Sequence, residues 1–206
     1  MSKLQTNTIQ HTANGAAVFT LPTSDGSAGQ VLTTNGSGVL SWTDDQKGKI
    51  LQVVQTVKTD TTSISSATYA DLSGLTATIT PASTSNKILV SFVLQYGGSN
   101  NSYVAFKAYR GSTLLPVGTS GTGNMTNASF GGFQEQGNSQ FGVQTAAWQY
   151  LDSPSSTSAL TYKLQWSSVY QPGGTYQIYL NRPYNADNNS YNIFGVSTVT
   201  AMEVAA

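Results

Sequence analysis

Apolar and polar residues alternate with a period of two along much of the chain after residue 48, and this spacing predicts β-strands. The clearest example is "KILVSFVLQY" at residues 87–96. One face of this strand carries Ile88, Val90, Phe92 and Leu94. The opposite face carries Leu89, Ser91, Val93 and Gln95. Because both faces hold apolar residues, the pattern is typical of a strand that lies between two covered surfaces.

Further runs of the same kind predict more strands. In residues 160–166 the apolar Tyr162, Leu164 and Trp166 alternate with polar residues, as in a half-buried antiparallel strand. The other predicted strands are "KILQVVQTVKT" (49–59), "LTATITP" (75–81), "SYVAFKAYR" (102–110), "TYQIYL" (175–180) and "IFGVSTVTAMEVA" (193–205).

Only "FGVQTAAWQYLD" at residues 141–152 offers a helical alternative, through the spacing of Val143, Ala147, Tyr150 and Leu151. No capping residue followed by an acid introduces it, and Gly142 weakens its first turn, so we predict a strand. Long loops at residues 118–140 and 181–191 interrupt the strands. About seven to ten short strands without a helix predict an all-β fold with an antiparallel jelly-roll-like β-sandwich.

Residues 1–48 have a different texture, with few core-forming residues and frequent turn dipeptides. "GQVLTTNGSGVLSW" at residues 29–42 predicts a β-hairpin around Asn35-Gly36. An isolated hairpin is marginal in water, so this arm needs a docking surface or copies of itself. We therefore divide the chain into an N-terminal attachment and trimerisation arm (1–48) and a sandwich domain (49–206). The residues expected to be buried in assembly are Val31, Leu32, Val39, Leu40 and Trp42.

Composition narrows the class of protein. Nine Lys+Arg balance nine Asp+Glu, which argues against a nucleic-acid partner held by charge. Only 9% of residues are charged, as suits a protein in an assembly or outside a cell. Cysteine is absent, so disulfides and thiolate metal sites are excluded. The first residues have no apolar run of signal-peptide length, and we expect no membrane insertion.

The sequence shows no catalytic constellation, so we expect no enzymatic activity, no catalytic residue, no cofactor and no metal. The one histidine, His11, lies in the arm and is interpreted as a solvated polar residue. "DNNS" at residues 187–190 lacks the acid spacing of a calcium loop. A glycosidase with paired carboxylates from distant strands stays open as an alternative.

Aromatic residues in turn-rich surroundings suggest a carbohydrate contact, because sugar rings stack on exposed aromatic faces beside hydrogen-bonding groups. The candidate glycan-contacting residues are Tyr170, Tyr184, Asn185, Asp187 and Tyr191. Core or inter-subunit packing of these tyrosines is the competing interpretation, and it is favoured.

Two parts of the chain resemble virion proteins of tailed bacteriophages. "FTLPTSDGSAGQVLTTNGSGVLSW" (19–42) is similar to a short module of tail-fibre and other fibre proteins, notably of marine and cyanobacterial phages. The segments that resemble a C-terminal domain of such proteins are "ILQVVQT" (50–56), "DLSGLTATITPASTSNKILV" (71–90), "YLDSPSSTSALTYKLQ" (150–165), "YLNRP" (179–183) and "STVTAMEV" (197–204). Residues 96–149 have no counterpart, and receptor-specific detail is expected there.

The resemblance implies a structural protein at the virion surface, usually a homotrimer, whose N-terminal part attaches to other virion proteins. Long tail fibres separate the two parts by an extended shaft, which this chain lacks. Two roles follow: a short fibre that contacts host-surface glycan, or a capsid decoration (cement) protein that clamps coat subunits. The fibre-type role is slightly favoured, and a carbohydrate-active enzyme on the same scaffold is the rival from another class.

Overall fold

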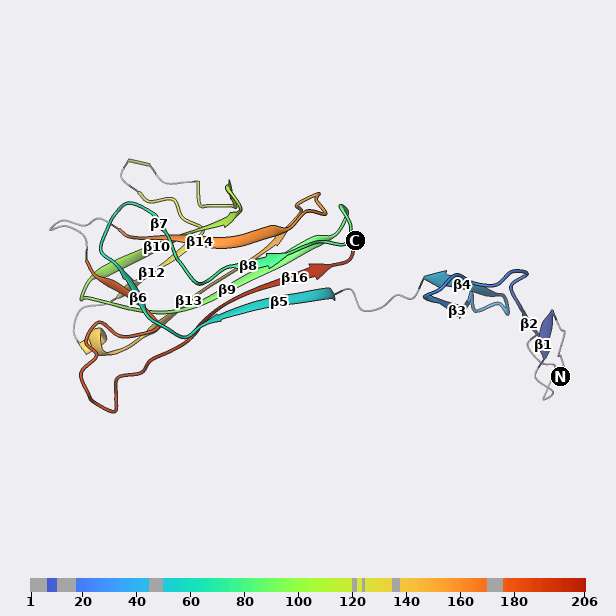
Figure 1. Cartoon of the computed structure of the whole chain (residues 1–206), viewed down its shortest axis with the longest axis horizontal. Coiled ribbons are helices and arrows are strands. Elements are labelled where there is room, and N and C mark those ends of the chain that lie inside the picture. Colours follow the sequence, from blue (N-terminus) through green and yellow to red (C-terminus); the bar gives the residue numbers. More distant parts are fainter. Residues whose placement is uncertain are drawn as a thin grey trace. The chain divides into compact units, whose positions relative to one another are not determined.

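A computed structural model describes residues 7–10, 18–44, 50–119, 122–123, 125–134, 138–169 and 176–206. The chain divides into two compact units, Met1–Gly48 and Lys49–Ala206, which we describe one at a time (Figure 1). The described residues contain β-strands and one short 3-10 turn, Asn138–Phe141, but no α-helix, which confirms the all-β prediction. Within them no helix has the length and apolarity to cross a membrane.

The first unit contains two small antiparallel pairs. Strand β1 (Thr8–Gln10) pairs with β2 (Val18–Thr20), and β3 (Gln30–Thr34) pairs with β4 (Leu40–Asp44). The Asn35 side chain closes the predicted hairpin by accepting hydrogen bonds from the backbone of Ser37 at 2.8 Å and Val39 at 3.2 Å. Gly36 and Gly38 take positive φ angles of 79° and 84°, which glycine adopts without strain.

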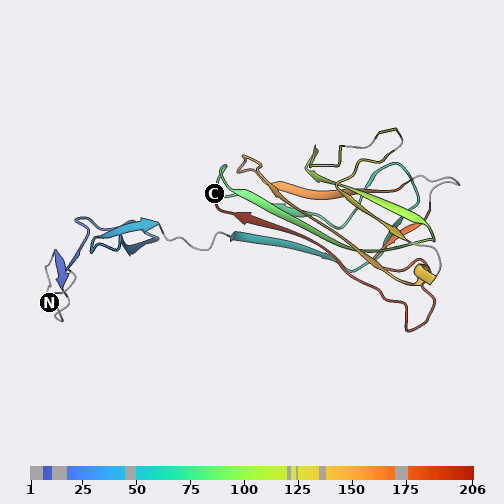
Figure 2. The ribbon, with the colours of Figure 1, turned by 180° about the vertical axis from the view of Figure 1, so that it is seen from behind.

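The second unit is built from two facing antiparallel sheets. The β9 sheet comprises β5 (Ile50–Lys58), β6 (Thr62–Ile64), β9 (Lys87–Gly98), β13 (Gln144–Asp152), β15 (Ile178–Leu180) and β16 (Ser197–Val204). The β10 sheet comprises β7 (Ala70–Asp71), β8 (Ala77–Ile79), β10 (Ser102–Arg110), β11 (Thr113–Leu114), β12 (Phe130–Gln134) and β14 (Leu160–Ser168). Figure 2 shows the two layers from behind.

The order of these strands is that of a jelly roll. Strands β15 and β16 follow one another along the same side of β9. On their other side β15 pairs with β6 and β16 pairs with β5. The couple β15 and β16 and the couple β5 and β6 therefore each act as one interrupted strand. In the same way β7 and β8 share β14, and β11 and β12 share β10. When each such couple is counted as one strand, the strands can be renumbered 1 to 8 in chain order. The strand order across the β9 sheet is then 1-8-3-6, and the order across the β10 sheet is 2-7-4-5. Successive strands thus cross between the sheets as in a double Greek key, which confirms the jelly-roll-like prediction.

The core lies between the two sheets and follows the predicted alternation. Ile88, Val90, Phe92 and Leu94 of β9 are fully buried, and Tyr162 and Leu164 of β14 contribute from the other sheet. Residues 144–152 form β13, so the choice of strand over helix is confirmed. The expectation that both faces of β9 are covered is wrong within one chain, because Val93 on the outer face is 36% exposed.

A buried polar cluster crosses the sandwich. Arg110 of β10 donates from Nη1 to both carboxylate oxygens of Asp152 on β13, at 2.8 and 2.6 Å. The Tyr162 hydroxyl of β14 donates to the same carboxylate at 2.7 Å. Burial raises the pKa of Tyr162, and the hydrogen bond to the negatively charged Asp152 raises it further. The cluster links both sheets at one fixed register.

Asn181 joins the ends of three strands. It is fully buried with a φ of 63°, a conformation that asparagine tolerates better than most residues. Its amide nitrogen donates to the backbone oxygens of Lys58 at 2.7 Å and Asp60 at 2.9 Å, and its amide oxygen accepts from the Ser197 hydroxyl at 2.6 Å. The end of β5 is thereby held against the beginning of β16.

Glu203 is a buried carboxylate on the inner side of β16. One of its oxygens accepts from Asn86 Nδ2 at 2.6 Å and the Ala82 backbone N–H at 2.7 Å, and the other accepts from Gln52 Nε2 at 2.6 Å. Burial acts to raise the pKa of Glu203. The hydrogen bonds from Asn86, Gln52 and the backbone of Ala82 and Ser83 outweigh it, and the pKa lies below its usual value of 4.5.

We expect the substitution Glu203→Gln to lower the free energy of unfolding at pH 7 by about 1–3 kcal/mol, because the amide puts a donor where all the neighbours donate. Since the pKa of Glu203 is lowered by folding, its stabilisation is complete above pH 4.5 and declines as the pH falls through the folded-state pKa. Urea unfolding of both proteins from pH 7 to pH 3 measures the difference. A difference in the free energy of unfolding that stays constant from pH 7 to pH 3 would contradict the prediction. The substitution Asp187→Asn in an exposed loop is the control.

Candidate functional site

The outer face of the β9 sheet carries rows of apolar side chains that cross four strands. Val53, Met202, Leu89 and Leu151 are successive partners in the strand register. A second row contains Val57, Thr198, Val93 and Ala147. Cross-strand neighbours of this kind form a continuous surface because their side chains point to the same side of the sheet. We name this surface the apolar face, and it comprises Leu51, Val53, Val57, Leu89, Val93, Ala147, Leu151 and Met202.

The row between these two is polar but uncharged. It contains Gln55, Thr200, Ser91 and Gln149. The Gln55 amide donates to the Thr200 hydroxyl at 2.8 Å, and the Gln149 amide donates to the Ser91 hydroxyl at 3.3 Å. Each of these amides thus has one hydrogen bond within the face, and its remaining donor and acceptor capacity would need partners if the row were covered.

The apolar face is open in the single chain. The exposed fractions of Val53 and Val57 are 55% and 50%, and that of Leu151 is 45%. Four strands about 4.8 Å apart and about 30 Å long present roughly 500 Å², with the polar row included. The apolar part is smaller than this and falls within the range of the largest apolar patches on monomeric proteins, which often mark interaction sites. Within the described residues, β5 pairs only with β16 and β13 only with β9, so both lateral edges of the face are free of a strand partner.

An exposed apolar segment extends this face. Between β15 and β16 the chain loops outward from the β9 sheet (Figure 1), and Ile193, Phe194 and Val196 are all exposed there. Gly195 lies against the side chain of Gln95, whose Cγ would be 2.7 Å from a Cβ at position 195. Gln95 points outward from β9 and donates to Thr145 of β13 at 2.8 Å. The segment therefore adjoins the outer side of the same sheet.

The sequence-predicted assembly residues fall into two groups. Leu32, Leu40 and Trp42 lie on one side of the hairpin, since Leu32 pairs with Trp42, and they are partly exposed. Trp42 rests on Gly26 and donates from Nε1 to the Ser24 carbonyl at 2.9 Å, so the arm covers part of this ring itself. Val31 points to the other side, and Val39 lies in the turn. Burial of these residues by another chain remains a prediction.

A small cavity in the first unit adjoins this side of the hairpin. It has a volume of about 370 Å³ and is lined by residues 21–25, Leu32 and Trp42. Leu32 and Trp42 thus share a concave surface within their own unit.

Four of the predicted glycan-contacting residues, Tyr184, Asn185, Asp187 and Tyr191, lie on the chain between β15 and β16. The Tyr184 ring is 6.0 Å from that of Tyr179, and the Tyr191 ring packs edge-on against Phe141 at 5.7 Å. Asn185 and Asp187 use backbone atoms to bond Gln140 and Asn192. Tyr170 lies outside the described residues. The role of these five residues in glycan contact stays a prediction.

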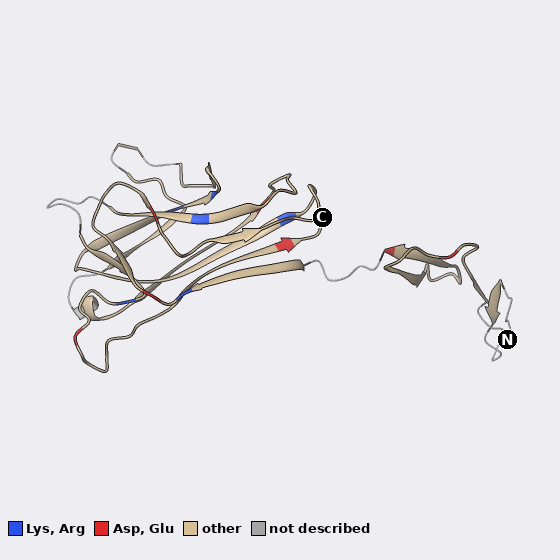
Figure 3. Ribbon diagram, in the orientation of Figure 1, with Lys and Arg blue, Asp and Glu red and all other residues tan. Residues whose placement is uncertain are grey.

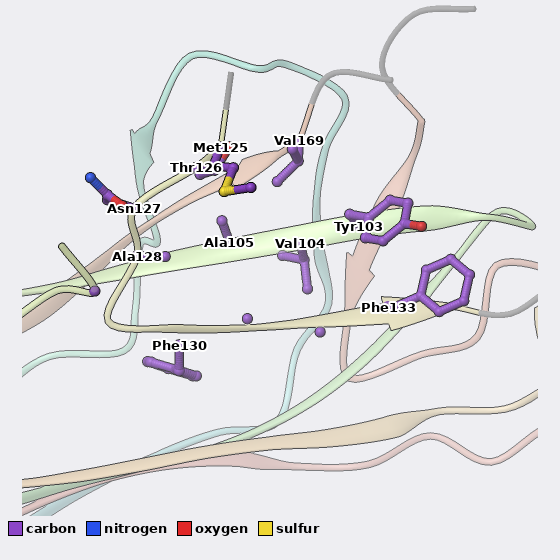
Figure 4. Close-up of a pocket in the computed structure, with 13 residues that line it drawn as sticks. Tyr103, Val104, Ala105, Met125, Thr126, Asn127, Ala128, Phe130, Phe133 and Val169 are labelled. Atoms are coloured by element: carbon purple, nitrogen blue, oxygen red, sulfur yellow. The ribbon is translucent and has the colours of Figure 1, made fainter. Parts of the chain in front are cut away.

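A groove on the outer side of the β10 sheet was not anticipated (Figure 4). Its volume is about 660 Å³, and β10, β12, residues 125–128 and Val169 line it. Tyr103 and Phe133 are opposed in register, and their rings stack with centroids 4.5 Å apart. Apart from Val169, the groove is lined by residues within 96–149, the stretch without a counterpart in the phage resemblance. Its one sequence signal is "FGGF" at residues 130–133, in which two glycines separate two aromatics.

Charged residues are sparse in both units (Figure 3). Several carboxylates have structural partners, as Asp71 has in Lys163 at 2.8 Å and Asp152 has in Arg110. In the parts of the chain that are described, no three His, Asp or Glu side chains gather where they could hold a metal ion.

Comparisons with known proteins give weak likeness only. No family model matches the chain, and no curated protein matches it. Among solved structures, that of the infectious bursal disease virus Gt strain is similar over 81% of this chain with 14% identity and a TM-score of 0.35. The Gx strain structure is similar over 81% with 13% identity and a TM-score of 0.35. This chain spans 40% of the length of either viral chain.

Proposed function

We propose that this chain is a non-enzymatic structural protein of a virion surface, and that its jelly-roll unit associates with copies of itself through the apolar face. The apolar face is the observation that carries the proposal. It is uncharged, it crosses four strands, and the glutamines of its polar row donate hydrogen bonds within the face. Its area of roughly 500 Å² is below the about 800 Å² per partner of a standard interface, and the exposed segment at residues 193–196 adds to it.

A second copy of the chain fits this face better than a charged partner. A charged surface placed against Val53, Val57 and Leu151 would lose its hydration without gaining an opposite charge. A copy of this chain instead offers an apolar surface, and in a two-fold dimer both copies would contribute the same apolar face. In the trimer that the sequence resemblance favours, the apolar face of each copy would contact a different surface of the next copy.

The arm would attach the protein to another virion component. Its resemblance to the short module of phage fibre proteins favours a short fibre that projects the jelly-roll unit towards host-surface glycan. A capsid decoration protein is the second candidate, because an arm with exposed apolar residues also suits clamping of neighbouring coat subunits. Virions imaged with a labelled antibody distinguish the two, since label over the head contradicts the fibre role.

The double substitution Val53→Glu and Leu151→Glu should convert the assembled protein to monomers. Each change puts an unpaired charge into the contact, and we expect the association constant to fall by at least about 100-fold. Analytical ultracentrifugation measures the mass, and circular dichroism checks the fold. Leu114→Glu, at an equally exposed position of the other sheet, should leave the oligomer intact. A wild-type protein that is monomeric at about 100 μM, or a double variant of unchanged mass, contradicts the proposal.

Deletion of residues 1–48 tests the arm separately. If the arm contributes to trimerisation, the truncated chain should dissociate at a higher concentration than the full-length chain, because the exposed Leu32 and Trp42 are lost from the contact. Sedimentation of both proteins over a dilution series provides the two dissociation constants. Equal constants would mean that the arm has no part in self-association and serves attachment alone.

A carbohydrate-active enzyme would release new reducing ends from host polysaccharide, whereas a structural protein would not. We expect no new reducing ends after prolonged incubation, since Asp152 and Glu203 are engaged in structural hydrogen bonds. A reducing-sugar assay against a polysaccharide-degrading enzyme as positive control measures this. Release of reducing ends that increases with protein concentration would establish the glycosidase and end the non-enzymatic proposal.

A further inference from the structure

The groove on the β10 sheet has the composition of a small-molecule site rather than of a protein contact. It is lined by 13 residues, and none of them is Lys, Arg, Asp, Glu or His. Its volume of about 660 Å³ falls within the usual range for ligand sites, which are mostly apolar with a few placed polar groups. An ionic ligand would find no counter-charge among these residues, so the occupant is expected to be neutral.

An aromatic platform stands at one end of the groove. Tyr103 is 42% exposed, and Phe133 stacks beside it from the neighbouring strand. The two residues are direct partners in the β10–β12 register, so the backbone hydrogen bonds of the sheet fix their relative position. A rigid, solvent-accessible pair of rings offers an apolar surface at low conformational cost, and the Tyr103 hydroxyl adds a hydrogen-bonding group at its edge.

The floor beside this platform is flat because it cannot carry side chains. Ala105 lies opposite Gly131 in the register. A Cβ at Gly131 would be 2.6 Å from the backbone oxygen of Val104, and a Cβ at Gly132 would overlap the Tyr96 ring on the inner side. Both glycines are therefore required by packing, and the open floor is a consequence of the sheet itself rather than of a loop conformation.

Polar groups lie at the end of the groove away from Phe133 (Figure 4). Thr126 and Asn127 stand there on the segment that borders the groove, and both are exposed. The Asn127 side chain points away from the other lining side chains (Figure 4), whereas the Thr126 hydroxyl can donate to and accept from a ligand that carries many hydroxyl groups. The groove thus combines aromatic stacking and neutral hydrogen-bonding groups, with no charged side chain among the lining residues that the structure describes.

From this arrangement we propose that the groove binds an uncharged saccharide, with one sugar ring stacked on the face of Tyr103 that Phe133 does not cover and further hydroxyls reaching Thr126. The site differs from the loop tyrosines that the sequence suggested. This proposal rests on the proposed function only for the choice of surface saccharides as ligands. It does not require association through the apolar face.

The probes for the test are maltohexaose, cellohexaose and chitohexaose, with a hexamer of galacturonic acid as the charged comparator. Isothermal titration calorimetry on the full-length protein should detect binding of at least one neutral hexasaccharide and not of the galacturonate. Tyr103→Ala should weaken that binding by at least about tenfold, and Phe133→Ala should act in the same direction. Tyr191→Ala, which removes an exposed tyrosine elsewhere, should leave the affinity unchanged.

Several results would overturn this proposal. They are the absence of binding to all three neutral probes at millimolar concentration, equal binding of the galacturonate, and an affinity that Tyr103→Ala does not change. A lower oligomer mass in Tyr103→Ala without saccharide binding would instead identify the groove as a contact between copies. The Val53→Glu, Leu151→Glu variant separates the two proposals, because it should lose self-association and keep the saccharide affinity.

Discussion

Strand β9 is the element on which the second unit depends, because it is hydrogen-bonded along both sides. On one side it pairs with β16 and then β15, and on the other with β13. Its inner residues fill the core, and its outer residues Leu89 and Val93 belong to the apolar face. A slip of one residue would exchange these two sets and place Ser91 in the core. One register therefore produces both the stability of the unit and the surface proposed for its assembly.

The inward alternation in β9 and β14 sufficed to predict the sandwich, because a period of two is a local property that the sequence displays directly. The Asn35-Gly36 turn predicted the hairpin for the same reason. Choosing a strand for residues 144–152 depended on the missing helix cap and on Gly142. These features need only neighbouring residues, and they were predicted from them.

The features that were not predicted all depend on which distant residues become neighbours. Leu89 and Val93 indicated a covered face, but the sequence does not say whether the cover comes from the same chain. The groove requires Ala105 to lie opposite Gly131 and Tyr103 opposite Phe133, a pairing between strands more than twenty residues apart. Nothing local marks Glu203 or Asn181 as buried, since both are ordinarily surface residues. The loop tyrosines were singled out by composition, which carries no information on where their rings point.

The uncharged rows of the apolar face determine how an assembly built on it would respond to its surroundings. Ionic screening acts on charges, and the three rows contain none, so screening by moderate salt would have little effect on association through them. Apolar association instead weakens on cooling. The physical variable that governs such an assembly is temperature, and a particle held together in this way tolerates changes of salinity better than cold.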